Sequence, residues 1–196
     1  KEWAHEFLGG GLNLEKPSLK RIEKFSLPKE NDWISLKPDP TIPLPGTRRI
    51  GEYVETARFP YKNADGELLY YVLRLENEEG KKITPPLRYG YEIGKEDSPH
   101  WKMKGFSQSL EEKKTLYHLE ELKQKPLAPV LVVEGEKAAN AAPAKMQTIR
   151  DKEYIAVTWP GGCKAALKTD WTPLAGREVL IWPDNDAGGF KAAKEI

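Results

Sequence analysis

The segments VLVVEGEK (residues 130–137) and VLIWPDNDAGG (residues 179–189) decide the fold of this chain. Each begins with four apolar residues and continues into acidic residues and glycine, which is typical of a buried parallel strand and the turn after it. Ligands of open α/β sheets gather outside the carboxyl ends of such strands. We therefore expect Glu134, Asp184 and Asp186 to lie together at one edge of a sheet.

Carboxylates at strand ends favour a hard divalent cation as their ligand. The neighbouring glycines let a phosphate approach the backbone, so the pattern predicts a site for Mg²⁺ or Mn²⁺ that acts on a phosphate substrate. A structural alternative exists, because an acid after a strand is often only the N-cap of the next helix. The repetition of strand, acid, glycine and alanine-rich helix within one chain favours the metal site.

The composition limits the other possibilities. The chain has 31 Lys+Arg against 30 Asp+Glu and a net charge of +1, so any basic surface for nucleic acid must be local. A single cysteine, Cys163, excludes an internal disulfide and a zinc site built on cysteines, and it fits a reducing cytoplasm. No apolar run approaches membrane-spanning length and no signal peptide is visible, so no membrane partner is expected.

Residues 51–105 have the pattern of an antiparallel meander. The Asn63–Gly66 stretch is a strong turn signal between two strand-like runs. Because side chains alternate along a strand, Tyr70, Val72 and Arg74 are expected on one face. Residues 36–46 are punctuated by prolines and should be extended.

From residue 128 the pattern changes to alternating strands and helices. This alternation predicts a parallel sheet, and the whole chain is expected to be an α/β protein, α+β overall. A short helix is expected just before it, at residues 115–124. The expected elements of the alternating part are a strand at 129–133, a helix at 136–145, a strand at 154–158, a helix near 163–168, a strand at 178–182 and a helix from about 189.

The strand ends and a turn between them resemble the TOPRIM domain, which bacterial primases share with type IA and type II topoisomerases and some nucleases. The resemblance rests on the Glu-Gly pair at 134–135, the Gly-Gly turn at 161–162 and the Asp-x-Asp at 184–186. It covers about residues 128–196, and it implies that such a domain continues beyond Ile196. The acids of this family hold magnesium, so it implies metal-binding and catalytic roles for Glu134, Asp184 and Asp186.

The segment in front of this region is similar to the small basic subdomain of bacterial replicative primases. The order of its motifs agrees: Phe59-Pro60-Tyr61, Asp65-Gly66, Arg74, Lys102 and Leu116-Tyr117. The combination is most similar to primase–helicases of phages, plasmids and other mobile elements. The resemblance implies that cations of this region and of the helix after Gly135 bind nucleotide or DNA, namely Arg74, Lys102, Lys104, Lys114 and Lys137.

The expected organisation is an extended proline-rich segment or linker (1–48), a basic β-rich primase subdomain (49–125) and a C-terminally incomplete TOPRIM domain (126–196). The implied function is that of a cytoplasmic DNA primase core, which makes RNA primers on single-stranded DNA from ribonucleoside triphosphates. Its implied partner is a replicative helicase, fused or separate. The family pattern has an acid at the place of Ala138, and further acids are expected downstream, which leaves open whether the chain is active alone.

Two other functions fit the same residues. The first is a TOPRIM nuclease or topoisomerase-like domain that processes DNA. The second is a non-catalytic module that binds single-stranded DNA, in which the acids only cap helices. Trp101 and Trp159 could stack on bases in any of these functions, although packing in the core or in turns is the favoured role for both.

Overall fold

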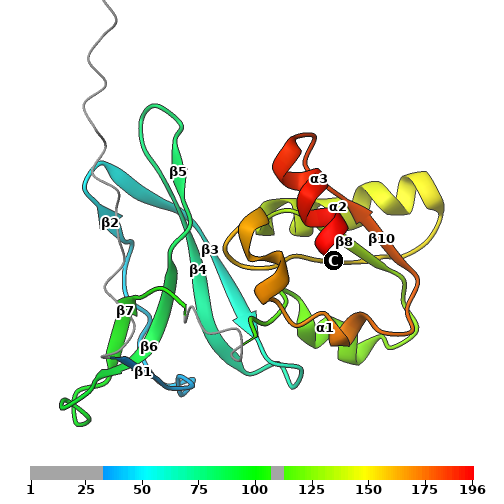
Figure 1. Cartoon of the computed structure of the whole chain (residues 1–196). Coiled ribbons are helices and arrows are strands. Elements are labelled where there is room, and N and C mark those ends of the chain that lie inside the picture. Colours follow the sequence, from blue (N-terminus) through cyan, green and yellow to red (C-terminus); the bar gives the residue numbers. More distant parts are fainter. Residues whose placement is uncertain (1–32, 107–112) are drawn as a thin grey trace, which may run out of the picture.

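The computed structural model describes residues 33–106 and 113–196, which form two β-sheets joined side by side (Figure 1). Residues 1–32, most of the predicted N-terminal linker, lie outside the described residues. The first sheet is antiparallel and has seven strands, and the second is parallel and has three. The α+β class expected from the sequence is therefore confirmed.

The antiparallel sheet has the strand order β1-β6-β4-β3-β2, with β5 paired to β4 and β7 to β6. Its longest strands, β3 and β4, form a hairpin whose turn is closed by a hydrogen bond from the Gly66 amide to the Asn63 carbonyl oxygen (3.0 Å). The predicted turn is therefore present. The strands are β1 (Trp33–Ser35), β2 (Arg49–Ile50), β3 (Tyr53–Lys62), β4 (Leu68–Glu76), β5 (Lys82–Ile83), β6 (Pro86–Glu92) and β7 (His100–Met103).

Part of the predicted N-terminal segment pairs with the antiparallel sheet. Trp33–Ser35 forms β1, which pairs antiparallel with β6 from Trp33 opposite Glu92 to Ser35 opposite Gly90. Trp33 is buried in this position. The segment from residue 33 therefore begins as part of the sheet, before the proline-punctuated stretch.

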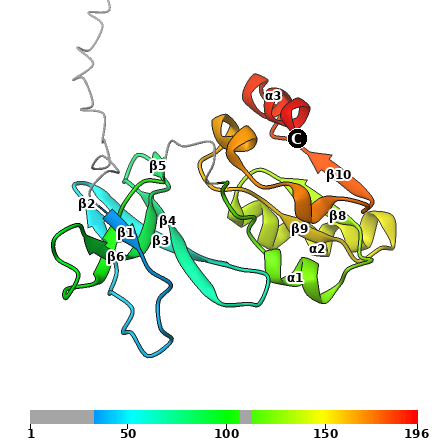
Figure 2. The ribbon, with the colours of Figure 1, turned by 60° about the horizontal axis from the view of Figure 1, so that its bottom comes forward.

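The parallel sheet has the order β10-β8-β9, so that β8 lies in the centre, and helices alternate with the strands along the chain (Figure 2). The predicted alternation is confirmed. The elements are α1 (Leu119–Gln124), β8 (Val130–Val133), α2 (Glu136–Arg150), β9 (Ile155–Val157), two 3-10 helices (Cys163–Lys168 and Thr172–Leu174), β10 (Val179–Trp182) and α3 (Ala187–Glu195).

Two helices differ from the prediction. The helix expected at 115–124 begins only at Leu119, because the Tyr117 amide donates to the Thr158 carbonyl oxygen (2.9 Å) and the Lys114 amide to that of Lys168 (2.8 Å). These tertiary hydrogen bonds hold residues 114–117 in an extended path beside the parallel sheet. The helix expected near 163–168 is a 3-10 helix, Cys163–Lys168.

The two sheets share one hydrophobic core. Tyr61, Tyr70 and Val72 of the antiparallel sheet belong to the same buried cluster as Leu131 and Val133 of β8. The alternate residues of β4, such as Leu73 and Leu75, pack in a separate cluster on the other face. The predicted alternation along β4 therefore holds, and it turns the Tyr70 face toward the parallel sheet. How the chain divides into domains stays a prediction.

A buried hydrogen bond also joins the antiparallel sheet to α2, the helix that follows β8. The Tyr61 hydroxyl donates to Glu136 Oε1 of α2 (2.8 Å), and the two residues are 0 % and 7 % exposed. Burial raises the pKa of the Glu136 carboxyl, an effect that this hydrogen bond opposes. The bond therefore stabilises the ionised form of a carboxyl group that the core disfavours.

Tyr61→Phe is expected to lower the free energy of unfolding by about 2 kcal/mol, because it leaves a buried carboxyl without its side-chain donor. The measurement is urea unfolding at pH 7. Tyr71→Phe is the control, since Tyr71 is half-buried against the other cluster of the sheet. If both variants lose the same free energy of unfolding, the hydrogen bond from Tyr61 to Glu136 does not contribute to stability.

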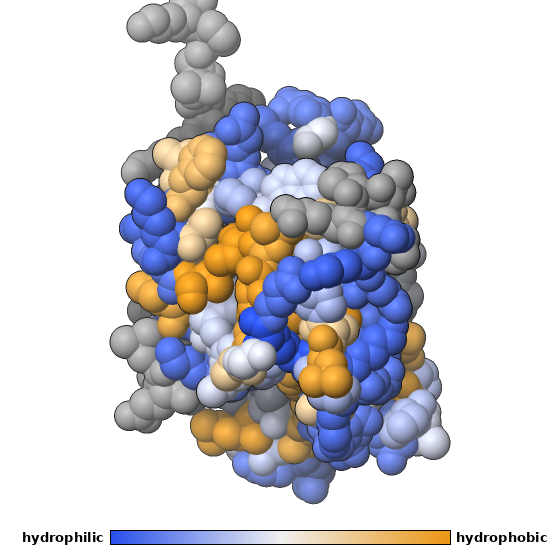
Figure 3. All heavy atoms as spheres, turned by 90° about the vertical axis from the view of Figure 1, so that its right-hand side faces the viewer, coloured by the Kyte–Doolittle hydropathy of each residue, from blue (hydrophilic) through white to orange (hydrophobic). Residues whose placement is uncertain are grey.

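The outer edge of the parallel sheet exposes apolar side chains. Val179 and Trp182 of β10 are 39 % and 48 % exposed, and Phe190 of α3 is 52 % exposed. Apolar surface is visible on this side of the molecule (Figure 3). Within residues 33–106 and 113–196, no helix is both long enough and apolar enough to cross a membrane.

Candidate active site

The carboxyl ends of β8 and β10 place two of the predicted acids side by side. The two strands are parallel neighbours with Val133 opposite Trp182, so Glu134 and Asp184 leave the sheet at the same edge. The backbone N–H of Asp184 donates to the Glu134 carboxylate. The sheet thus brings together acids that lie 50 positions apart in the sequence, as their strand-end positions predict.

The third acid, Asp186, has a structural role in addition to any chemical one. Its Oδ1 accepts a hydrogen bond from the Gly189 amide (2.8 Å), which makes it the N-cap of α3. Asp184 and Asp186 are both exposed to solvent. The capping alternative considered from the sequence is therefore present for Asp186.

Two glycines allow the backbone conformation and the close packing seen at this edge of the sheet. Gly135 has φ +90°, a conformation that other residues rarely adopt, and its amide donates to Thr158 Oγ1 at the end of β9 (2.9 Å). A Cβ atom on Gly189 would lie 2.4 Å from the Asp184 carbonyl oxygen and 2.7 Å from Glu134 Oε1. The loop from Asp184 can therefore fold against Glu134 only because position 189 has no side chain.

The acids crowd one another electrostatically. Burial, and then the negative charges of Asp184 and Asp186, raise the pKa of the Glu134 carboxyl above its ordinary value. Glu134 Oε1 is buried and has no hydrogen-bond partner in the described part of the chain. A buried acceptor without a donor, beside two further carboxylates, fits a cation as its missing partner.

The side chains of Glu134, Asp184 and Asp186 are not arranged around a single point. Among the residues that the structure describes, no three His, Cys, Asp or Glu side chains come close enough together to hold an ion. The donor set of three carboxylates fits Mg²⁺ or Mn²⁺, but Asp184 and Asp186 would have to turn toward Glu134 to share one. Oxygen ligands of this kind are what both ions prefer.

Glu134→Gln is expected to make the protein more stable at pH 7. Because the pKa of Glu134 is raised on folding, the folded chain holds this proton more tightly than the unfolded chain does. The free energy of unfolding therefore decreases as the pH rises above 4.5, the ordinary pKa of a glutamate. Glutamine does not ionise, so the variant should be more stable than the original chain at pH 7 and equally stable below pH 4.5. Urea unfolding at several pH values measures it.

The control for this measurement is Glu78→Gln, which changes an exposed glutamate in the turn after β4. If the Glu134→Gln variant is less stable than the original chain at pH 7, the folded protein must already stabilise the ionised Glu134 carboxylate, and the expectation is wrong.

A cavity of about 360 Å³ opens in front of the acids, and both sheets line it. Glu134 and Asp184 lie on one side of its lining, and Arg74 of β4 and Lys82 of β5 come from the antiparallel sheet. Lys137 of α2 completes the set of cations. Arg74 is ion-paired with Glu76, whose Oε1 lies 3.8 Å from Lys137 Nζ. The cavity thus combines acids with three cations, which suits a ligand that carries phosphates.

Sequence reasoning missed two residues of this cavity. Lys82 enters through the pairing of β5 with β4, where it lies opposite Glu76. Glu136 also lines the cavity, and it is the residue that accepts from Tyr61. For Lys82, the turn that ends at Gly80 was a usable signal, because it returns the chain along the strand that carries Arg74. No comparable signal marks Glu136.

The remaining predicted cations lie elsewhere. Lys102 of β7 is ion-paired with Glu92 and lies over the Trp33 ring (5.7 Å), outside the acidic cavity. Lys104 is only 3 % exposed. Lys114 lies over the Phe106 ring (4.9 Å) and lines a second cavity. Of the predicted cations, the structure therefore brings only Arg74 and Lys137 to the acids.

The two tryptophans considered for base stacking are engaged in packing. Trp159 is 4 % exposed, and its indole N–H donates to the Gly162 carbonyl oxygen (2.8 Å). Trp101 packs between the rings of Tyr71 and Tyr89. These positions agree with the packing role that the sequence favoured.

No protein-family model and no curated protein matches the chain. Among solved structures, the chain is similar to one chain of an assembly of bacteriophage T7 lagging-strand DNA polymerase with primase domains of two gp4 subunits, bound to an RNA/DNA hybrid and dTTP. The TM-score is 0.43 at 16% identity, and the alignment covers 73% of this chain and 62% of that chain.

Proposed function

We propose that residues 33–196 belong to a DNA primase core, which joins ribonucleotides on a single-stranded DNA template. The observation that supports this is the cavity in which Glu134 and Asp184 lie together with Arg74, Lys82 and Lys137. Nucleotidyl transfer needs positioning and neutralisation of charge more than covalent chemistry from the protein. A cavity with both acids and cations meets that need.

In the proposed reaction, a 3′-hydroxyl attacks the α-phosphate of a ribonucleoside triphosphate. The new bond joins that oxygen to phosphorus, the bond to the β-phosphate oxygen breaks, pyrophosphate leaves, and the hydroxyl proton passes to solvent. Arg74, Lys82 and Lys137 would hold the triphosphate, and an arginine can bind two of its oxygens at once.

Glu134, Asp184 and Asp186 would hold Mg²⁺ or Mn²⁺. When bound, the ion would neutralise the negative charge that gathers on the phosphates. The alternative for Glu134 is the role of a general base, for which its raised pKa is suited. We favour ligation or orientation, because its carboxylate already accepts the Asp184 amide.

The remaining assignments rest on the family resemblance. We propose that residues 49–125 contact template and nucleotide and that residues 126–196 carry the acids. Single-stranded DNA, ribonucleoside triphosphates and a replicative helicase are the proposed partners, and the cytoplasm is the proposed location.

One observation favours a second function, that of a non-catalytic module that binds single-stranded DNA. Asp186 caps α3 through its Oδ1, which is the role that this alternative assigns to the acids. It predicts DNA binding that is indifferent to Mg²⁺ and to loss of the acidic charges.

The test is incorporation of a labelled ribonucleotide on single-stranded DNA by a protein that contains residues 1–196, with Mg²⁺ or Mn²⁺. Omission of the template and addition of EDTA are the controls. Incorporation that needs both template and metal is expected. Its absence together with metal-dependent nicking of plasmid would favour a nuclease, and DNA binding alone would favour the module.

A further inference from the structure

The three cations of the acidic cavity lie around one acid. Arg74 and Glu76 are two positions apart in β4, so their side chains lie on one face of the strand. Arg74 Nε donates to Glu76 Oε1, and Lys137 Nζ of α2 lies 3.8 Å from the same oxygen. Lys82 of β5 is the residue opposite Glu76 in the adjacent strand. Cations from three separate elements therefore meet at a single carboxylate.

Glu76 lies outside the lining of the cavity, although all three cations line it. Its contact with Arg74 is made through Nε. The two terminal nitrogens of a guanidinium can bind two oxygens of one phosphate, and this contact does not use them. A ligand in the cavity can therefore bind Arg74 while Glu76 still accepts from its Nε.

The electrostatics of Glu76 reflect all three cations. The pKa of its carboxyl is lowered, chiefly by the hydrogen bond from Arg74; burial opposes this effect, and the charges of Lys137 and Lys82 add to it. Glu76 is therefore ionised at neutral pH and attracts each cation. Glu136 also attracts Arg74 and Lys82 through its charge. Glu76 differs from it in being ion-paired with Arg74 and Lys137.

This pairing lowers the free-energy cost of binding a ligand. Arginine and lysine side chains are long, and they lose conformational freedom when a ligand immobilises them. A carboxylate that already restrains them from outside the lining removes part of that cost. Residues around a metal site orient the metal ligands in the same way. Removal of Glu76 would free Arg74 and Lys137 to adopt other rotamers.

We propose that Glu76 is a positioning residue, which holds the three cations of the cavity where they bind the phosphates of a nucleoside triphosphate. The inference rests on the triphosphate binding proposed above for this cavity, and it does not require nucleotide transfer. Three cations from β4, β5 and α2 match a chain of three phosphates better than a single phosphate. Loss of Glu76 should therefore weaken binding of a polyphosphate more than binding of inorganic phosphate.

The experiment is calorimetry of inorganic tripolyphosphate in EDTA, which measures binding without metal, template or nucleotide transfer. Glu76→Ala is expected to weaken this binding about tenfold, because two long side chains must then be ordered by the ligand. Charge alone predicts the opposite sign, since removal of a negative charge beside the cations favours a polyanion. Equal or tighter binding by Glu76→Ala would overturn the proposal, and so would the absence of binding by the original chain.

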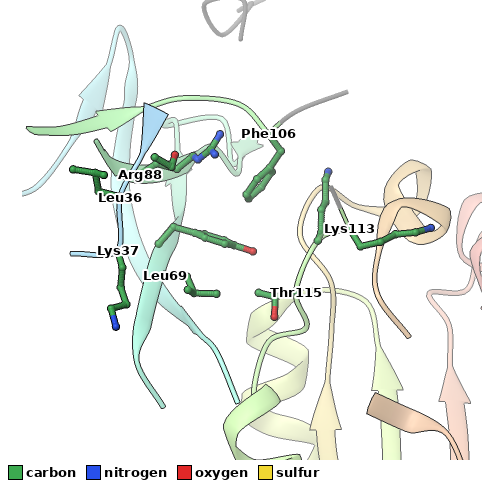
Figure 4. Close-up of a pocket in the computed structure, with 10 residues that line it drawn as sticks. Leu36, Lys37, Leu69, Arg88, Phe106, Lys113 and Thr115 are labelled. Carbon is green, nitrogen blue, oxygen red and sulfur yellow. The ribbon is translucent and has the colours of Figure 1, made fainter. Parts of the chain in front are cut away.

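Two variants control for charge and for the place of binding. Glu79→Ala removes a glutamate that is paired with Lys81 in the turn after β4, and neither residue lines the acidic cavity. Lys113→Gln changes a residue that lines the second cavity together with Arg88 (Figure 4). Both controls should keep their affinity for tripolyphosphate, whereas Lys137→Gln should lose affinity. An equal loss in Lys113→Gln and Lys137→Gln would contradict the assignment to the acidic cavity.

A double-mutant cycle shows whether Glu76 acts through Arg74. The loss of affinity in Glu76→Ala/Arg74→Ala should be smaller than the product of the two single losses, because a cation that is absent cannot be positioned. Losses that multiply would show that the two residues act independently and would overturn the proposal. If Glu76→Ala fails to fold, Glu76→Asp replaces it. It keeps the charge and shortens the side chain, so unchanged affinity would contradict positioning.

Kinetics provide a further measurement in a protein that incorporates ribonucleotides. Glu76→Ala should raise the KM for the ribonucleotide about tenfold and leave kcat nearly unchanged, as expected when binding of the substrate is lost. A fall in kcat with an unchanged KM would contradict the proposal. Failure of the primase reaction is seen in the incorporation assay, and failure of this proposal is seen in the binding of tripolyphosphate, so the two can be distinguished.

Discussion

The Asp184→Asn/Asp186→Asn variant is expected to incorporate ribonucleotides at least about 100-fold more slowly than the original protein, because it removes two charges from the acidic edge. Asparagine keeps the size of each side chain, and it is as good an N-cap as aspartate, so α3 should keep the cap that Asp186 provides. The measurements are the rate of labelled ribonucleotide incorporation and the melting temperature.

Asp170→Asn is the matched control for this variant. Asp170 also accepts from a backbone amide at the start of a helical turn, that of Thr172 (3.0 Å), but it does not line the acidic cavity. The control should leave both rate and stability unchanged. A double variant that loses charge, keeps its fold and keeps its rate would show that the acids serve only as caps.

Gly189→Ala is expected to cost about 3 kcal/mol of folding free energy, because overpacking against backbone atoms cannot be relieved by rotating a side chain. The new Cβ would lie 2.4 Å from the Asp184 carbonyl oxygen and 2.7 Å from Glu134 Oε1. Relief of these contacts must move the loop away from Glu134. The substitution should therefore also weaken any binding of Mg²⁺, measured by calorimetry beside urea unfolding.

Gly188→Ala is the control for the Gly189→Ala variant, because it places the same methyl group one position earlier in the same helix. Its Cβ would meet only side-chain atoms, Cys163 Sγ at 3.1 Å and Asp186 Oδ1 at 3.2 Å. Alanine also favours a helix over glycine, by up to about 1 kcal/mol, so a change within about 1 kcal/mol is expected. A larger loss at position 188 than at position 189 would contradict the role assigned to the close approach.

The sequence could predict the elements whose signal is local. Two apolar runs that end in acids predicted parallel strands, and their adjacency in the sheet places Glu134 beside Asp184. Alternation along β4 predicted that Arg74 shares a face with Tyr70 and Val72, and that face turns toward the parallel sheet. The alternation of side chains along a strand and the direction of the strand are properties of a single segment. They can therefore be predicted without knowing which strand pairs with it.

The features that the sequence could not predict depend on distant partners. The strand at Trp33–Ser35 exists because it pairs with β6, more than fifty positions later. The late start of α1 depends on Thr158 and Lys168, which bind the backbone of residues 114–117. The side chain of Lys104 is buried, and Lys82 lines the acidic cavity. Nothing in the sequence around either lysine distinguishes these two positions.

The shared core has a consequence for how ligands enter the acidic cavity. Arg74 belongs to one sheet and Glu134 to the edge of the other, yet buried side chains from both sheets pack in a single cluster between them, and Tyr61 is bonded across the junction. Rotation of one sheet away from the other, which would widen the cavity, would separate the buried side chains of this cluster and expose them to water. We therefore expect the two walls to keep their separation, so that any ligand of the acidic cavity would be selected by its size and charge.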